Sequence, residues 1–190
     1  MRLPIGGRRC HESLPFGHPM PTTPPDFDTD ALLREIVEAF GGVSRAGGLS
    51  WTDAMALDLM GVPRVDFPVA HREDDQSWLD VADDPGWDPY RGAGGWPFLD
   101  RVGFRYYLAA AMNRAVRTGE SGDLAHQMEL PFNAKARRRF LDRWILDLRQ
   151  QRVAVRVAEL MRARAFAADD TSGFDEWDRV VQGWSAPASQ

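Results

Sequence analysis

The run FLDRVGFRYYLAAAM, residues 98–112, places three reactive or polar side chains inside a stretch that otherwise has the composition of a protein core. Arg105, Tyr106 and Tyr107 follow one another between a phenylalanine and a leucine. A guanidinium can bind an anion or stack on an aromatic ring, and a phenol can donate or accept a hydrogen bond. Tyrosine, tryptophan and arginine also dominate the energetics of protein interfaces. These three residues are therefore candidates for a binding site.

Aromatic residues of the preceding segment could complete such a site. The sequence DDPGWDPYRGAGGWPF, residues 83–98, is too rich in proline and glycine for regular structure, and Trp87, Tyr90 and Trp96 are its expected anchors. One hypothesis is that these rings cover a recess that holds a small ligand or a side chain of a partner. The interpretation that we favour is core packing, with the hydroxyls hydrogen-bonded and Arg105 paired with an acidic residue of segment 66–88. A buried guanidinium without a partner would be very costly.

The charge is distributed unevenly along a chain whose net charge is −5. Residues 66–88 contain eight acidic residues and one basic residue, whereas residues 135–164 contain ten basic and three acidic residues. The basic segment includes Arg137, Arg138 and Arg139, a patch that could contact phosphates. Proteins that bind nucleic acids are usually basic overall, whereas the pI of this chain is about 5.4. The acidic segment offers an internal counterpart that makes a nucleic acid unnecessary, and the sequence does not predict whether the two segments pair within one chain.

Residues that could support catalysis or hold a metal are few and scattered. No H-E-x-x-H, G-x-S-x-G, C-x-x-C or phosphate-binding-loop pattern occurs. The one cysteine, Cys10, lies with His11 and His18 in a proline-rich stretch, which is a poor frame for a metal site. The remaining histidines are His71 and His126. The sequence favours a protein that is not an enzyme, holds no metal and needs no cofactor, and it leaves an uncharacterised enzyme open as an alternative.

Length and composition fit one domain with a tail at each end. The chain has 190 residues, of which 44% are hydrophobic and 27% charged, a usual balance for a globular protein. Frequent prolines predict a disordered tail over residues 1–27, because each proline removes an amide donor. A helical domain is expected over residues 28–184 and a flexible tail over residues 185–190. The single cysteine and the lack of an apolar stretch of ~18 residues favour a cytoplasmic protein that does not enter a membrane.

Capping residues and apolar spacing predict a mainly α fold, a compact bundle of about seven helices with at most one short β hairpin. Ser50 with Asp53, and Asp147 with Gln150, form capping-box patterns. Alternation of apolar residues predicts a short strand within residues 123–130. Helices are predicted within residues 28–42 and 50–63, and over about 72–83, 101–118, 134–145, 147–168 and 172–184.

The helix over residues 101–118 is expected to be the buried centre of the bundle. Asp100 is its predicted N-cap, and Gly119 ends it. Its apolar residues form one continuous stripe, and further apolar residues cover much of the opposite side, which is typical of a helix buried on all sides. The stripe consists of Phe104, Leu108, Ala111, Met112 and Ala115.

Three segments together resemble a bacterial domain family of unknown function. They are FLDRVGFRYYLAAAM, the later LDLRQQRVAVRVAELM, and a closing aromatic helix that ends in GW. Members of that family show a Phe-Leu-x-x-x-Gly-Phe-Arg-Tyr-Tyr-Leu-Pro-Ala signature, and here Ala109 takes the place of the proline. The resemblance covers about residues 29–184 and implies a shared fold. It brings no known activity, cofactor or catalytic residue.

Taken together, these features favour a cytoplasmic bacterial protein that binds another protein, as an immunity-like or accessory domain does. A capped helical body with separated charges and seven tryptophans, but without a catalytic pattern, is typical of such a domain. The first alternative is an enzyme or small-ligand protein that uses the recess at Arg105, Tyr106 and Tyr107. The second alternative is nucleic-acid binding through residues 135–164. The sequence does not predict the oligomeric state.

Overall fold

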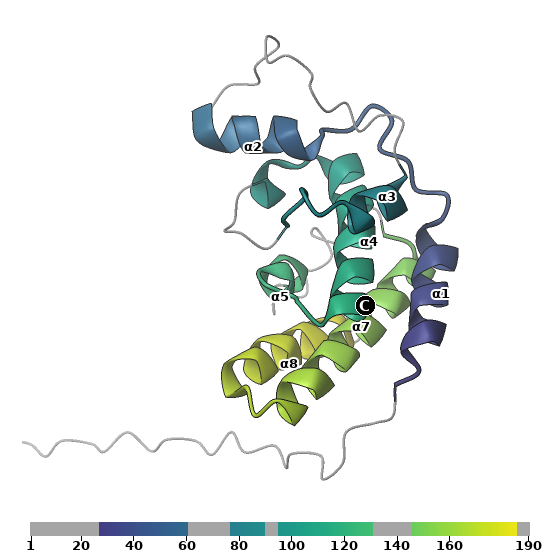
Figure 1. Cartoon of the computed structure of the whole chain (residues 1–190), viewed down its shortest axis with the longest axis vertical. Helices are drawn as coiled ribbons and strands as arrows, with labels where there is room; N and C mark the ends of the chain where they lie inside the picture. Colours follow the sequence, from purple (N-terminus) through teal and green to yellow (C-terminus); the bar gives the residue numbers. More distant parts are fainter. Residues whose placement is uncertain (1–26, 61–76, 90–94, 131–145, 186–190) are drawn as a thin grey trace, which may run out of the picture.

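The computed structural model describes residues 27–60, 77–89, 95–130 and 146–185 (Figure 1). These residues form helices joined by turns, with no β-strand among them, so the predicted mainly α fold is confirmed. The proline-rich tail and the helix predicted over residues 134–145 lie outside this part of the chain. The helices are α1 (Thr29–Phe40), α2 (Trp51–Met60), α3 (Trp78–Asp83), the 3-10 helix η2 (Trp96–Phe98), α4 (Arg101–Thr118), α5 (Leu124–Met128), α7 (Leu148–Ala167) and α8 (Thr171–Ser185).

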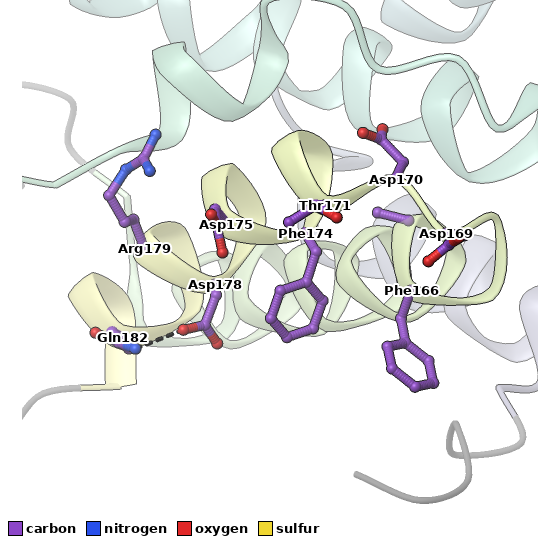
Figure 2. A pocket seen from close by; sticks show the side chains of 10 residues that line it. Phe166, Asp169, Asp170, Thr171, Phe174, Asp175, Asp178, Arg179 and Gln182 are labelled. Atoms are coloured by element: carbon purple, nitrogen blue, oxygen red, sulfur yellow. Dashed lines mark hydrogen bonds between the residues drawn. The ribbon is translucent and has the colours of Figure 1, made fainter. Parts of the chain in front are cut away.

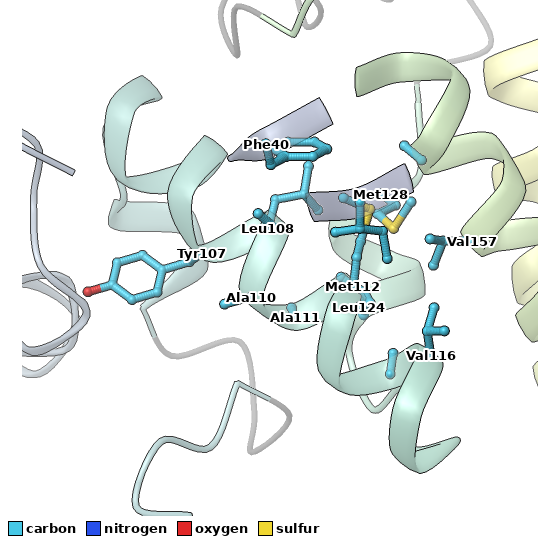
Figure 3. Packing of buried hydrophobic residues seen from close by; sticks show 14 of the residues in the cluster. Phe40, Tyr107, Leu108, Ala110, Ala111, Met112, Val116, Leu124, Met128 and Val157 are labelled. Carbon is cyan, nitrogen blue, oxygen red and sulfur yellow. The ribbon is translucent and has the colours of Figure 1, made fainter. Parts of the chain in front are cut away.

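Helix α4 lies at the centre of the described fold, and it begins and ends where its capping residues predict. The Asp100 carboxylate accepts a hydrogen bond from the Gly103 N–H (2.8 Å), and Gly119 adopts the left-handed conformation (φ 80°) just after the last turn. Helices α1, α3 and α7 pack against α4. Residues 108–112 are completely buried, and Figure 3 shows this stretch with Phe40 of α1 and Val157 of α7. The predicted buried central helix is confirmed.

Helix α1 packs against both α4 and α7, and two ion pairs link its polar edge to α7. Its buried face carries Leu32, Ile36 and Phe40, in agreement with the helical spacing of the sequence. On the edge, Glu38 pairs with Arg149 (2.5 Å), and Glu35 pairs with Arg156. Arg149 and Arg156 of α7 thus pair with carboxylates of α1, which lie directly beside them, while residues 66–76 of the acidic segment lie outside the described part of the chain.

Helices α7 and α8 form an antiparallel hairpin at one end of the molecule (Figure 1). The predicted capping box at the start of α7 is present, with Asp147 accepting from the N–H of Gln150 (2.8 Å) and the Gln150 side chain accepting from the N–H of Asp147 (3.2 Å). Helix α8 buries Trp177 and Val180 against its neighbours. Trp184 donates from its indole nitrogen to the Met128 carbonyl (2.6 Å) and so attaches α5 to the hairpin.

Two expectations about local structure are wrong. The predicted strand within residues 123–130 is the short helix α5, because Leu124, Ala125 and Met128 share one buried helical face while His126 is exposed. The third helix was expected to begin near residue 72, but α3 begins at Trp78. Its start is set by a capping box between Ser77 and Asp80 that the sequence analysis missed.

None of the helices in the described segments is both long enough and apolar enough to cross a lipid bilayer.

Candidate functional site

Four aromatic rings from three segments of the chain meet in the interior beside α4. Trp51, the first residue of α2, contacts Trp87 (ring centroids 5.6 Å apart), Trp96 (5.2 Å) and Tyr107 (5.3 Å) in edge-on arrangements. The Tyr107 hydroxyl accepts a hydrogen bond from the backbone N–H of Trp51 (2.7 Å), an amide in the first turn of α2 that has no acceptor within its own helix. Tyr107 therefore fixes the start of α2 on the middle of α4.

The aromatic residues of the predicted recess that the structure describes are packed inside the protein. Tyr106 and Tyr107 are 1% and 0% exposed, and Trp96 is 1% exposed. The structure brings Trp87, Trp96 and Tyr107 together, and it adds Trp51, which the sequence analysis did not include in the site. The sequence feature that could have identified Trp51 is its position directly after a predicted N-cap. The amides in the first turn of a helix need acceptors from elsewhere in the protein.

Two buried donors of the predicted recess have no hydrogen-bond acceptor in the described part of the chain. They are the Nε of Arg105 and the indole Nε1 of Trp87. The ion pair expected between Arg105 and an acidic residue does not occur within the described residues, and the side chain of Arg105 is half-buried. Unpaired buried donors are uncommon in folded proteins, so each of these two atoms marks a position where an acceptor could bind.

Arg114 holds the segment that carries Trp87. Its Nε donates to the Ala82 carbonyl (2.9 Å), and its two terminal nitrogens donate to the carbonyls of Trp87 and Asp84. Its guanidinium also lies 5.2 Å from the centre of the Trp87 ring, within the range of a cation–π contact. One side chain of α4 thus satisfies carbonyls at the end of α3 and positions the aromatic residue that follows.

Arg164 of α7 has a similar role near the C-terminal end of α4. It donates to the carbonyls of Ala115 (3.0 Å) and Val116 (2.8 Å). Burial lowers the pKa of the Arg164 guanidinium, because desolvation disfavours the charged form. Arginine nevertheless stays protonated in proteins, so Arg164 places a positive charge at the end of α4 where the helix dipole is negative.

An open pocket of about 630 Å³ lies along the end of α7 and the outer face of α8 (Figure 2). Ligand sites commonly have volumes of ~300–1,000 Å³, so its size suits a bound side chain or small molecule. Phe166 of α7 and Phe174 of α8 project to the same side, with ring centroids 6.2 Å apart, and neither ring is fully buried. The carboxylates that line the pocket with these rings belong to Asp169, Asp170, Asp175 and Asp178.

The turn between α7 and α8 positions two of these carboxylates. Asp169 has a φ of 55°, the left-handed conformation that aspartate and asparagine tolerate better than most residues. Asp170 accepts a hydrogen bond from the Gly173 N–H (3.0 Å) and so caps the start of α8. A Cβ atom at position 173 would lie 2.3 Å from the Asp170 carboxylate, so a larger residue there would require this carboxylate to move.

The positive charges near the pocket are already paired. Arg162 binds Asp178 (2.6 Å), whose other oxygen accepts from Gln182 (2.5 Å). Arg179 lines the pocket but pairs with Glu129 of the segment after α5 (3.3 Å). The arginines therefore leave the remaining carboxylates uncompensated.

Asp169 and Asp175 are the pocket carboxylates that have neither an ion pair nor a capping role in the described part of the chain. Both are exposed, and neither forms an ion pair with another described residue. The sequence analysis missed this site because its two rings come from different helices and meet only through the turn. The available signal was a pair of phenylalanines on either side of Asp169 and Asp170 near the end of a predicted helix.

Other predicted candidates are not placed by the structure. Tyr90 and the basic patch of Arg137, Arg138 and Arg139 lie outside the described residues. Within the segments that are described, no three histidine, cysteine, aspartate or glutamate side chains gather in a way that could hold a metal ion.

Comparison with protein-family models identifies the family of this chain. Residues 28–188 match the model described as "Family of unknown function (DUF6714)". The chain belongs to this family. The matched range includes both the aromatic cluster beside α4 and the α7–α8 pocket, so both are parts of the family domain. A search of the curated proteins and a search of the solved structures find no match.

Proposed function

We propose that this chain is a protein-interaction domain of the immunity-like or accessory kind, and that it binds one partner protein through the α7–α8 pocket. The observation that carries the proposal is the open pocket at Phe166 and Phe174, whose half-buried rings lie together among carboxylates. Half-buried aromatic side chains surrounded by charged groups are typical of a contact site.

The interior of the molecule supports the same proposal. The aromatic residues Trp51, Trp96 and Tyr107 contact one another, and the Tyr107 hydroxyl is used to hold α2. These groups serve packing, which leaves the outer surface as the place for recognition. A cytoplasmic location in a bacterial cell belongs to this proposal and is supported by the single cysteine and by the family resemblance.

A photo-crosslinking experiment in the cells that make the protein tests the proposal. The photoreactive residue p-benzoylphenylalanine replaces Phe174 in the full chain, and adducts formed on irradiation are identified by mass spectrometry. We expect one discrete protein adduct, because a partner seated on the pocket lies within a few ångströms of this position.

A matched control uses the same photoreactive residue in place of Phe98. Phe98 is another partly exposed phenylalanine (38% exposed), but it belongs to η2, which packs with α2 at the opposite end of the molecule from α8 (Figure 1). The proposal is wrong if position 174 gives no adduct, or if positions 98 and 174 give the same adducts.

A second candidate function, small-ligand binding at the aromatic cluster, is favoured by the two buried donors without an acceptor, Arg105 Nε and Trp87 Nε1. A ligand that supplies an acceptor to Arg105 Nε would raise the melting temperature in a thermal-shift screen of metabolites. We expect the gain to disappear in Arg105→Ala. A screen without any stabilising compound would remove this candidate and leave the protein-interaction proposal intact.

A further inference from the structure

We propose that the α7–α8 pocket recognises an arginine side chain on an exposed segment of the partner protein. This inference rests on the proposed function and adds the chemistry of the partner. Two phenyl rings, an excess of negative charge and a volume that can enclose a long side chain occur together at this one place. Together these features select a cation with an apolar stem.

The aromatic part of the site is formed by Phe166 and Phe174. Their ring planes are inclined at 57°, with centroids 6.2 Å apart, so the two faces form an open angle and do not cover each other. A guanidinium is planar and weakly hydrated, and it stacks on aromatic faces more readily than an ammonium does. The methylene stem of an arginine would cover the remaining apolar surface of the rings.

The electrostatic part of the site is formed by Asp169 and Asp175. Both carboxylates are exposed and have no ion pair in the described part of the chain, whereas Arg179 is paired with Glu129. A guanidinium between the rings would therefore meet carboxylates and no free cation. Carboxylates accept two parallel hydrogen bonds from arginine, a geometry that lysine cannot reproduce.

The same charges exclude other classes of partner. Phosphates of a nucleic acid would be repelled by Asp169, Asp170 and Asp175, so the pocket does not suit DNA or RNA. An acidic protein segment would be repelled in the same way. A partner with an exposed arginine beside apolar residues satisfies both the rings and the carboxylates.

A titration of the full-length chain with defined peptides, followed by amide signals in ¹⁵N-HSQC spectra, tests the inference. The probe is the capped peptide Gly-Leu-Arg-Arg-Leu-Gly, and the comparison peptides carry lysine or glutamine in place of both arginines. We expect shifts centred on the pocket, at residues 165–182, with the arginine peptide. We expect affinity about three-fold weaker for the lysine peptide and at least ten-fold weaker for the glutamine peptide.

Variants separate the two parts of the site. Asp169→Asn combined with Asp175→Asn removes both free charges, and asparagine keeps the left-handed backbone at position 169. We expect at least five-fold weaker binding of the arginine peptide by this double variant. Phe174→Leu keeps an apolar side chain but removes the ring, and we expect about three-fold weaker binding.

The matched control is Asp58→Asn, which neutralises an exposed aspartate on α2, far from the hairpin (Figure 1). It should bind the arginine peptide as the wild type does. Circular dichroism of every variant shows whether the fold is kept. A fall in affinity that is equal in Asp58→Asn and in the pocket variant would overturn the inference, because net charge alone would then explain it.

Two further outcomes would also overturn it. One is equal binding of the arginine and glutamine peptides. The other is saturation of the same residues by free spermidine at the concentration needed for the peptide, since the pocket would then be a polyamine site. If crosslinking at position 174 still identifies a partner in either case, the proposed function stands and only the arginine chemistry is wrong.

Discussion

At the scale of single residues, Tyr107 shows how a polar atom can be placed in a core without a loss of stability. Its ring contacts three other aromatic residues, and its hydroxyl accepts the hydrogen bond from the Trp51 N–H. Burial of the ring and satisfaction of the helix amide are achieved by the same side chain. The hydroxyl is therefore structural, which explains why a tyrosine occurs where a phenylalanine would fit the apolar stripe.

The substitution Tyr107→Phe tests this role. It keeps the ring but leaves the amide of Trp51 buried without an acceptor, which costs about 1–3 kcal/mol. We expect the free energy of unfolding in urea to fall by that amount, with an unchanged dependence on denaturant concentration. A loss below about 0.3 kcal/mol would mean that the amide has another acceptor and that the role assigned to the hydroxyl is wrong.

Gly103 allows the segment before α2 to approach the backbone of α4 closely. A Cβ atom at position 103 would lie 2.6 Å from the Leu49 carbonyl oxygen, so the segment before α2 packs directly on the backbone of α4. In an ordinary helix the change from glycine to alanine stabilises by about 1 kcal/mol. The contact with a backbone oxygen, which cannot rotate away as a side chain can, reverses the expected sign here.

We therefore expect Gly103→Ala to lower the melting temperature in differential scanning calorimetry. Gly42→Ala is its matched control, because a Cβ atom at position 42 would meet no atom within 4 Å. That variant should melt at the wild-type temperature or slightly above it, since alanine restricts the unfolded chain. A melting temperature for Gly103→Ala at or above that of Gly42→Ala would show that the segment before α2 can move away from α4 without a loss of stability.

At the scale of elements, helix α3 has six residues and depends on side chains of α4 for its position. Arg114 donates to carbonyls of Ala82, Asp84 and Trp87, and Arg117 donates to Ala82 (3.0 Å) and pairs with Asp83 (2.5 Å). Helices this short are not stable alone in water, so tertiary contacts must supply the stability.

The variant Arg114→Met tests this dependence, because methionine keeps much of the apolar stem but donates no hydrogen bond. We expect faster amide exchange over residues 77–87, by ten-fold or more, as local opening becomes easier. Amides of α7 near Val157 should keep their exchange rates. Equal acceleration in both regions would indicate a general loss of stability in place of a local one.

The limits of most described elements could be predicted from the sequence because capping is a local effect. Asp100 and Gly119 define α4, and Asp147 with Gln150 starts α7, in each case through bonds within a few residues. The element that was assigned the wrong structure, α5, is five residues long, and so short a pattern fits both a helix and a strand. Whether these residues form a helix or a strand depends on their burial against α8, and a local sequence pattern does not contain this information.

At the scale of the whole molecule, the candidate site was much less predictable than the fold. The sequence analysis singled out Tyr106, Tyr107 and Trp96 because of their types, and the structure places them in the interior. The α7–α8 pocket depends on Phe166 and Phe174, which are brought together by the left-handed residue Asp169. Backbone handedness at a single turn is not encoded in apolar periodicity, so this site becomes visible only in three dimensions.

The charges that remain free in the folded protein could not be predicted from the sequence either. Counting residues suggested two opposed segments, but in the described part Arg149 and Arg156 of α7 pair with α1, and Arg162 pairs with α8. Which charges remain free is decided by neighbours in space. The free carboxylates of the pocket could not be identified from charge counts along the chain.

The position of Arg164 links the hairpin to the centre of the protein. It lies on α7 two residues before Phe166, and its guanidinium holds the carbonyls of the last turn of α4. A bound molecule that restrained the tip of the hairpin would therefore also suppress fraying at the far end of the central helix. The proposed recognition site and the interior are in this way connected through one side chain.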